Sequence, residues 1–160
     1  MPRQARIIEK DVCFHVISRG NQKRNVFRED RDYSSFLTIL KKYKWHYLFK
    51  LYAYCVMPNH FHLLLEIEPV EDLSELMKRI NQTYAIYFNN KYSTCGHLWQ
   101  GRYKSMIITM DDYLVDCIHY IEFNPIRAGM VARPEDYKWS SYKDRITGVR
   151  NGILNHLDKI

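Results

Sequence analysis

The chain has 160 residues, with 24 lysines and arginines against 18 aspartates and glutamates, and a formal net charge of +6. Its length suits one domain with its own core, and it has no apolar run of the ~18 residues that a membrane-spanning helix needs. The four cysteines form no C-x-x-C pair, and no apolar run follows the basic N-terminus, so we expect a reduced, cytoplasmic protein with no membrane partner.

Aromatic residues make up 14% of the sequence, with 13 tyrosines and 7 phenylalanines. Basic side chains neutralise phosphates, and rings with a polar tip stack on unpaired bases, so this composition favours a nucleic-acid partner. Mild basic charge is also common in soluble proteins that bind no nucleic acid. Composition alone therefore leaves both interpretations open.

The first half of the chain predicts a strand, a helix and a hairpin. Residues 12–18 are rich in β-formers and end at an Arg-Gly-Asn turn. From 30 to 47 the apolar positions recur at helical spacing, and residues 49–57 return to a strand pattern. A Pro-Asn turn then leads into a further strand that begins at residue 60. The polar loop at 22–25 suits either a phosphate clamp or an ordinary solvated loop.

The second half predicts a long helix, a strand and a last strong helix. Asp72 and Glu75 suggest a capping pair at the start of the long helix. A glycine-punctuated loop follows, in which Trp99 either anchors the core or packs against DNA. Residues 106–109 read as a strand and residues 113–123 as the last helix.

The order β-α-β-β-α-β-α predicts an α+β fold of the ferredoxin-like sandwich type, in which helices pack on an antiparallel sheet. We expect one domain over residues 1–142 and a C-terminal tail over residues 143–160. Because this fold serves many functions, the function has to be inferred from the site.

Two histidines on the strand that begins at residue 60 form the most informative pattern. Alternate strand residues share a face, so His60 and His62 point to one side with Leu64, while Phe61 and Leu63 point to the other. One face would then build core, and the other would carry two imidazoles able to hold a divalent cation from one side. The alternative is a half-buried pair with a structural role, and the spacing alone does not decide.

The last predicted helix buries an apolar stripe and places Tyr120 and Asn124, four residues apart, together at its edge. Such a position suits a side chain that must react. Tyr113 lies seven residues before Tyr120, so it falls on nearly the same face at a distance of roughly 10 Å. Geometry therefore does not exclude Tyr113.

Five short motifs occur in order along the chain: residues 1–6 (Met-Pro-Arg-Gln-Ala-Arg), 19–21 (Arg-Gly-Asn), 57–64 (Met-Pro-Asn-His-Phe-His-Leu-Leu), 98–105 (Leu-Trp-Gln-Gly-Arg-Tyr-Lys-Ser) and 120–131 (Tyr-Ile-Glu-Phe-Asn-Pro-Ile-Arg-Ala-Gly-Met-Val). Together they resemble the REP-associated tyrosine transposases, single-tyrosine HUH enzymes related to insertion-sequence transposases. The resemblance runs from residue 2 to about residue 142. His-Phe-His alone is a weak signal, whereas five motifs in register are specific.

The resemblance implies cutting and rejoining of single-stranded DNA at hairpin-bearing repetitive palindromic elements, through a covalent 5′-phosphotyrosine. On this sequence it implies Tyr120 as the nucleophile and favours it over Tyr113, as does the presence of Asn124. It also implies His60 and His62 as ligands of Mg²⁺ or Mn²⁺, with Asn124 as a third ligand. A phosphotyrosine conserves the bond for rejoining, so no ATP motif is needed. A nucleoid-associated location is implied, and monomer and homodimer both stay open.

Basic and polar residues supply the predicted DNA contacts: Arg3, Arg6, Arg19, Asn21, Lys23, Arg24, Arg102, Lys104 and Arg127. A second class of function also stays open. In that class a ferredoxin-like module only binds single-stranded nucleic acid through aromatic residues on its sheet face, and the histidines are structural.

Overall fold

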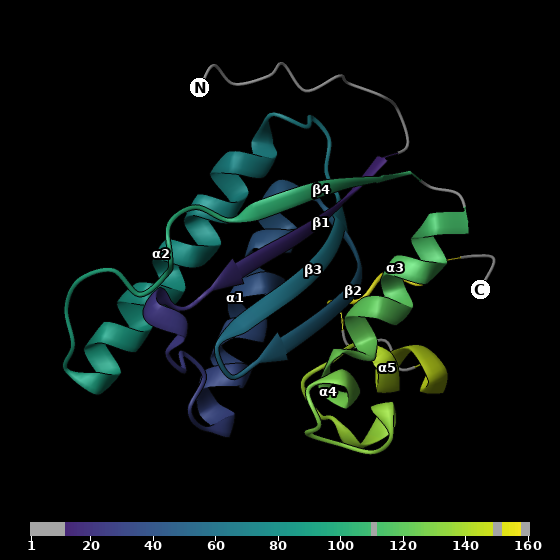
Figure 1. Ribbon diagram of the computed structural model, residues 1–160. Helices are drawn as coiled ribbons and strands as arrows, with labels where there is room; N and C mark the ends of the chain where they lie inside the picture. The colour runs from purple at the N-terminus through teal and green to yellow at the C-terminus, as the bar shows by residue number, and fades with distance from the viewer. Residues whose placement is uncertain (1–11, 110–111, 149–151, 158–160) are drawn as a thin grey trace.

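The computed structural model describes residues 12–109, 112–148 and 152–157. The elements follow in the order β1 (Val12–Arg19), α1 (Asp30–Tyr47), β2 (Lys50–Met57), β3 (His60–Glu66), α2 (Asp72–Tyr92), β4 (Lys104–Thr109), α3 (Asp112–Glu122), α4 (Asn124–Arg127) and α5 (Tyr142–Thr147), with short 3₁₀ helices at Asn21–Lys23 and Pro134–Asp136. The predicted order of strands and helices is confirmed (Figure 1). No helix within the described ranges is long and apolar enough to cross a membrane.

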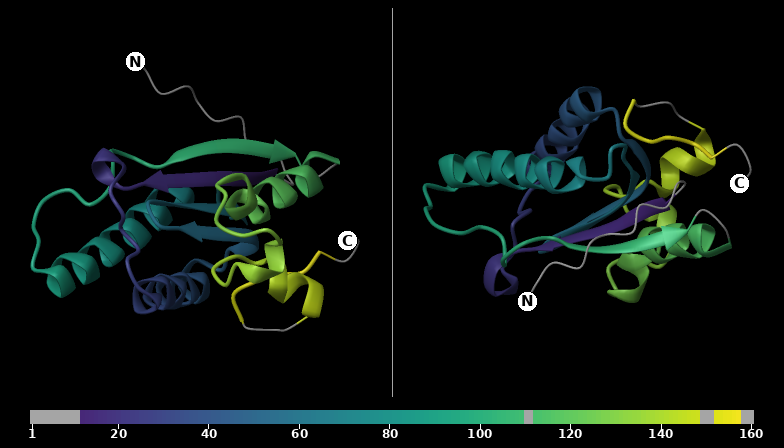
Figure 2. Two further views of the ribbon diagram at one scale, coloured as in Figure 1. Left: turned by 60° about the horizontal axis from the view of Figure 1, so that its bottom comes forward. Right: turned by 90° about the horizontal axis from the view of Figure 1, so that it is seen from above.

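The sheet has the strand order β2-β3-β1-β4, and each neighbouring pair is antiparallel. β1 and β3 are therefore the central strands, with Ile17 opposite His62 and His15 opposite Leu64. The right-hand view of Figure 2 shows α1 and α2 on one side of the sheet and α3 on the other. This arrangement is the predicted ferredoxin-like sandwich with an additional helix.

The face of the sheet beneath α1 and α2 carries the larger core. β3 contributes Phe61, Leu63 and Leu65, which are fully buried under the apolar stripes of the two helices. Trp99 packs at the margin of this core, with its ring centroid 5.4 Å from that of Phe61. Its indole nitrogen donates a 2.9 Å hydrogen bond to the carbonyl of Asn81 on α2. The core-anchor role that the sequence left open for Trp99 is therefore observed.

The opposite face carries a second, smaller core. α3 packs an apolar stripe against β2, β3 and β4, and this stripe consists of Leu114, Cys117, Ile118 and Ile121. The alternation expected along β3 is present, yet Leu64 is fully buried on the face that it shares with the histidines. The sequence predicted a core on the opposite face alone, and this is wrong, because α3 packs on the histidine face and builds a second core there.

Three of the four cysteines, Cys13, Cys55 and Cys117, are free thiols within this second core. Burial raises the pKa of Cys13 to about 12 and that of Cys117 to about 11, and it raises the pKa of Cys55 as well. Buried thiols in apolar surroundings are inert. These three thiols are packing residues, whereas Cys95 is exposed.

The predicted capping pair at the start of α2 is wrong. The N-cap residue is Glu71, which already has helical angles (φ −61°, ψ −26°), and no side-chain cap bond is made at this described helix start. A side-chain cap needs an N-cap residue with extended backbone angles. Asp72 is instead the first residue of the helix, so its side chain does not cap it. Glu75 instead forms an i,i+4 ion pair with Arg79, at 2.8 Å between Oε1 and Nε.

The C-terminal segment extends the fold along the free edge of β2. The backbone N–H of Val56 donates to the carbonyl of Trp139 at 2.8 Å. Further on, the side-chain oxygen of Asn155 accepts a 3.0 Å hydrogen bond from the backbone N–H of Leu51. The described part of the predicted tail at 143–160 thus packs against the sheet, and the domain boundary at its start stays a prediction.

A buried carboxylate joins the start of α1 to the end of α2. Asp32 is fully buried and accepts hydrogen bonds from Tyr87 Oη at 2.8 Å, Tyr92 Oη at 2.5 Å and Lys91 Nζ at 2.7 Å. The backbone N–H of Arg28 donates a further bond at 2.9 Å. Burial by itself raises the pKa of this carboxyl, but these donors outweigh burial and lower the pKa to about 2.

This depressed pKa predicts acid-sensitive stability. Because Asp32 binds its proton less readily in the folded than in the unfolded chain, its contribution is complete above pH about 4 and is lost as the pH falls towards 2. Asp32→Ala should cost about 3–5 kcal/mol of unfolding free energy, since Lys91 loses its buried partner. Asp30→Ala is the control, because its side chain is 77% exposed and its ion pair with Lys138 is worth less than ~1 kcal/mol. Urea denaturation of both variants measures the difference, and equal losses would contradict the assignment.

Candidate active site

The two histidines of β3 lie side by side at the end of the sheet. The β2–β3 turn places His60 at the first position of the strand, where its Nδ1 lies 2.6 Å from Asn59 Oδ1. His62 follows two residues later and is 4% exposed. The ring centroids of the two histidines are 5.0 Å apart. The strand pattern thus brings together the pair that the sequence identified.

A third histidine, absent from the sequence-based set, completes this cluster. His15 on the neighbouring strand β1 is 2% exposed, and its Nε2 lies 2.9 Å from Nδ1 of His62. The two rings stack with centroids 5.2 Å apart. The only available signal was that His15 alternates with Cys13 on one face of a strand, and the sequence did not show which strand pairs with β3.

α3 and the corner after it bring the predicted nucleophile and third ligand to the histidines. The ring centroid of Tyr120 lies 6.1 Å from that of His62 and 6.0 Å from that of His15. The helix ends at Glu122, yet Asn124 still reaches the cluster from the start of α4, with Nδ2 2.8 Å from Nε2 of His62. Tyr120 and Asn124 therefore both reach His62, although the helix ends between them.

The end of α3 is fixed by a buried ion pair. Glu122 is 1% exposed, and its Oε1 accepts hydrogen bonds from Ser141 Oγ at 2.7 Å and from Arg145 Nε at 2.9 Å. Arg145 also donates to the backbone carbonyl of Tyr52 on β2. This clamp ties the helix that carries Tyr120 to α5 and to the sheet.

The three imidazoles are held neutral at physiological pH. Burial lowers the pKa of His15 to about 4. For His60, burial and the charge of Arg19 lower the pKa to about 4. For His62, burial comes first and the neighbouring histidines, Arg127 and Arg19 add to it, so that the pKa falls to about 3. Neutral rings keep a lone pair available for a ligand.

The hydrogen bonds define where those lone pairs point. Asn59 Oδ1 can only accept, so His60 carries its proton on Nδ1 and its lone pair on Nε2. Asn124 Nδ2 can only donate, so His62 also has its lone pair on Nε2. The Nδ1 proton of His62 therefore points to Nε2 of His15. Both residues of the His-x-His pair present Nε2 as an electron donor.

This donor set fits a divalent cation. Two imidazole nitrogens together with an amide oxygen, available if the Asn124 side chain turns over, make an open three-ligand site. The described residues contain no group of three or more His, Cys, Asp or Glu side chains arranged around one metal position. Among the residues predicted from the sequence, Asn124 is the one that could add a third donor to the two imidazoles.

The predicted DNA-contacting residues fall into separate groups. Arg19 ends β1 opposite His60, and Arg127 lies with Cζ 4.1 Å from the ring centroid of Tyr120, so both border the histidine cluster. Arg102 and Asn21 line a cavity beside α2. Arg24 instead makes internal contacts, since its guanidinium donates to the carbonyl of His97 at 3.2 Å.

The remaining predicted DNA contacts divide between exposed and undescribed positions. Lys23 lies in the short 3₁₀ helix after β1 and is exposed, as is Lys104 at the start of β4. Arg3 and Arg6 lie outside the described residues. For the loop at 22–25, the exposure of Lys23 keeps the phosphate clamp open, while the contacts of Arg24 assign that side chain a structural role.

Comparison with known proteins decides the family. The sequence model of the IS200-like transposases matches residues 9–124, a range that includes all five residues of the histidine, tyrosine and asparagine cluster. The chain belongs to this transposase family. An IS200-like transposase binds and processes DNA, so the nucleic-acid partner favoured by composition is DNA.

Similar proteins carry a more specific name. A curated protein of Haemophilus influenzae, named as a REP-associated tyrosine transposase, is 28% identical over 120 residues, and the match covers 68% of each chain. The solved structure of a REP-associated tyrosine transposase bound to a REP hairpin has a TM-score of 0.75 at 20% identity, over 98% of this chain and 93% of that one. A transposase structure from Deinococcus radiodurans has a TM-score of 0.51 at 22% identity, over 76% of this chain and 96% of that one. The resemblance drawn from the five motifs is confirmed, as is the fold.

The role of His15 can be tested through the tautomer of its neighbour. In His15→Ala the Nδ1 proton of His62 loses its acceptor, so we expect the Nδ1/Nε2 proton distribution of His62 to shift. Nitrogen-15 NMR of the imidazoles measures this shift directly. DNA cleavage should fall about 10–100-fold, the usual effect of removing the hydrogen-bond partner that orients a functional histidine.

A conservative variant separates this role from simple packing. His15→Gln retains an acceptor at the end of the side chain and should restore the His62 nitrogen shifts in part. His46→Ala, at an exposed position on α1, is the control for losing a histidine. Unchanged His62 shifts in His15→Ala would rule out the positioning role.

Proposed function

We propose that this transposase nicks and rejoins single-stranded DNA at hairpin-bearing repeats, with Tyr120 as the nucleophile. The observation that carries the proposal is the convergence of the Tyr120 ring and the Asn124 amide on His62. The solved relative bound to a REP hairpin supports hairpin DNA as the substrate class.

In the proposed reaction, the phenolic oxygen of Tyr120 attacks the scissile phosphorus and loses its proton to solvent. A phosphorus–oxygen bond forms to Tyr120 as the bond to the 3′-oxygen breaks, and that oxygen leaves as a 3′-hydroxyl after taking up a proton. The side chain of Tyr120 is suitably placed, because the residue is 50% exposed while its ring stays against the histidines. Rejoining reverses these bonds, so the phosphotyrosine conserves the energy of the cut bond.

The residues around Tyr120 have distinct roles in this scheme. His60, His62 and Asn124 would hold Mg²⁺ or Mn²⁺, which when bound supplies Lewis-acid stabilisation of charge on the phosphate. Arg127 lies over the Tyr120 ring and donates to its backbone carbonyl, which places positive charge beside the attacking group. Arg19 supplies a second cation next to His60.

The binding-only alternative receives less support from the fold. That alternative needs aromatic side chains on an open face of the sheet, as in sheet-based binders of single-stranded nucleic acid. In this chain α1 and α2 cover one face and α3 packs on the other. An enzyme with a buried histidine cluster beneath a half-exposed tyrosine accounts for both observations.

Tyr120→Phe tests the nucleophile. With a hairpin-bearing single strand and Mg²⁺ or Mn²⁺, the wild-type protein should form a protein–DNA adduct that survives denaturation. The variant lacks only the phenolic oxygen, so the adduct should disappear while folding and DNA affinity are retained. Gel electrophoresis detects the adduct, and mass spectrometry locates the nucleotide on the chain.

Tyr113→Phe is the matched control, since Tyr113 lies on the same helix and is 68% exposed. This variant should form the adduct at the wild-type level. Loss of the adduct in Tyr113→Phe alone would move the nucleophile two turns earlier. Absence of any adduct with the wild-type protein, on any hairpin substrate, would favour the binding-only module.

The proposed metal ligands can be tested separately from DNA affinity. His60→Ala and His62→Ala should each abolish cleavage, because both Nε2 donors are needed. DNA affinity should change little, since phosphate contacts come from lysine and arginine side chains. Fluorescence anisotropy measures binding, and titration with Mn²⁺ followed by electron paramagnetic resonance measures metal affinity. Full cleavage by the double variant, or in excess chelator, would remove the metal from the mechanism.

A further inference from the structure

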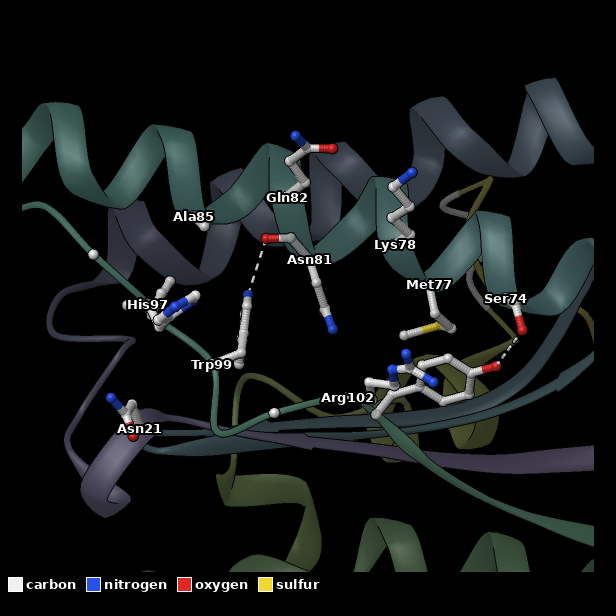
Figure 3. A pocket seen from close by; sticks show the side chains of 14 residues that line it. Asn21, Ser74, Met77, Lys78, Asn81, Gln82, Ala85, His97, Trp99 and Arg102 are labelled. Atoms are coloured by element: carbon white, nitrogen blue, oxygen red, sulfur yellow. Dashed lines mark hydrogen bonds between the residues drawn. The ribbon is translucent and has the colours of Figure 1, made fainter. Parts of the chain in front are cut away.

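The cavity lined by Asn21 and Arg102 lies away from the histidine cluster, between α2 and the loop that precedes β4 (Figure 3). Its volume is about 960 Å³, at the upper end of the ~300–1,000 Å³ typical of ligand sites. Its lining includes Asn21, Met77, Asn81, Trp99, Arg102 and Tyr103. The cavity therefore has room for more than one unpaired nucleotide.

The lining suits a nucleic-acid strand. None of its 14 residues, all in the described part of the chain, is acidic, while Lys78 and Arg102 are exposed cations. Tyr103 is held in place by a 3.0 Å hydrogen bond between its hydroxyl and Ser74 Oγ. Trp99 is likewise fixed by its bond to the backbone of Asn81. Fixed rings beside positive charge match a phosphodiester backbone with unstacked bases.

One polar group in this cavity lacks a partner. Asn81 donates from Nδ2 to Ser18 Oγ at 3.0 Å, but its side-chain oxygen is buried and has no hydrogen-bond partner among the described residues. Figure 3 shows the Asn81 side chain pointing from α2 into the space between Trp99 and Arg102. A buried acceptor without a donor is costly, and a rotation of the Asn81 amide would present this oxygen to a ligand that supplies an N–H group.

We propose that this cavity binds an unpaired base of the target strand and that Asn81 recognises the exocyclic amino group of that base. Adenine fits best, because an asparagine amide can accept from its N6 amino group and donate its free N–H to N7. The inference rests on the proposed function only in taking the single-stranded target DNA as the ligand.

The cavity is connected rigidly to the histidine cluster. Asn21 N–H donates to the carbonyl of Leu98 at 2.8 Å, and Gly20 N–H donates to the carbonyl of Asn59, next to His60, at 2.7 Å. A side chain at Gly20 would place its Cβ 2.5 Å from the carbonyl oxygen of Arg24, so only glycine fits there. A base held by Asn81 is thereby positioned relative to the site where the strand is cut.

The test compares two probes on an unreactive protein. Fluorescein-labelled oligodeoxyadenylate and the same oligomer built from 2′-deoxynebularine, which lacks the N6 amino group, are titrated with the Tyr120→Phe variant without added metal. We expect the adenine oligomer to bind about tenfold more tightly, as one base-specific contact of this kind provides. Fluorescence anisotropy gives both dissociation constants. Equal affinity for the two probes overturns the proposal. This comparison needs no substitution among the residues that line the cavity.

A second variant assigns the preference to its residue. Asn81→Ala in the Tyr120→Phe background should abolish the tenfold preference, whereas Asn90→Ala, at an exposed position on the same helix, should retain it. Circular dichroism verifies that both variants are folded. Retention of the preference in folded Asn81→Ala would overturn the assignment.

This result is independent of the adduct experiment. A lost preference with intact adduct formation by wild-type protein would remove only the base site, and an absent adduct with an intact preference would remove only the nucleophile.

Discussion

The structure depends on β3 serving two different cores at once. Its odd-numbered residues from Phe61 to Leu65 close the larger core under α1 and α2, and its even-numbered residues face α3. Leu64 anchors the apolar half of that second face, while His60 and His62 occupy the other half. The position of α3 on the sheet, and with it Tyr120, is therefore set by ordinary hydrophobic packing next to the imidazoles.

Much of this arrangement follows from local patterns that can be recognised in the sequence. The period of two along β3 predicts that His60 and His62 are neighbours, and they are. The i,i+4 spacing predicts that Tyr120 and Asn124 act at one place, and both lie against His62. His15 was missed because its role depends on which strands pair, and register between distant strands is decided by the whole sheet. The false capping pair at Asp72 has a local cause, since the chain enters α2 already in a helical conformation.

Charge and burial are separated at the histidine cluster. The imidazoles are largely buried and neutral, whereas Arg19 and Arg127 lie exposed at their margin. The number of arginines and lysines in the sequence overestimates the number available to bind DNA. Arg24 is an example, because its guanidinium donates to the carbonyl of His97. Phosphate contacts in such a protein depend on which arginines remain accessible, more than on the net charge of the chain.

The clamp on Glu122 bears on how much chain this enzyme needs. The family match ends at residue 124, yet the partners of Glu122 are Ser141 and Arg145, well beyond that point. A graft that stopped at the end of the match would carry the nucleophile but would leave a buried carboxylate without its cation. The shortest fragment of this transposase that keeps the Glu122–Arg145 ion pair therefore extends through α5.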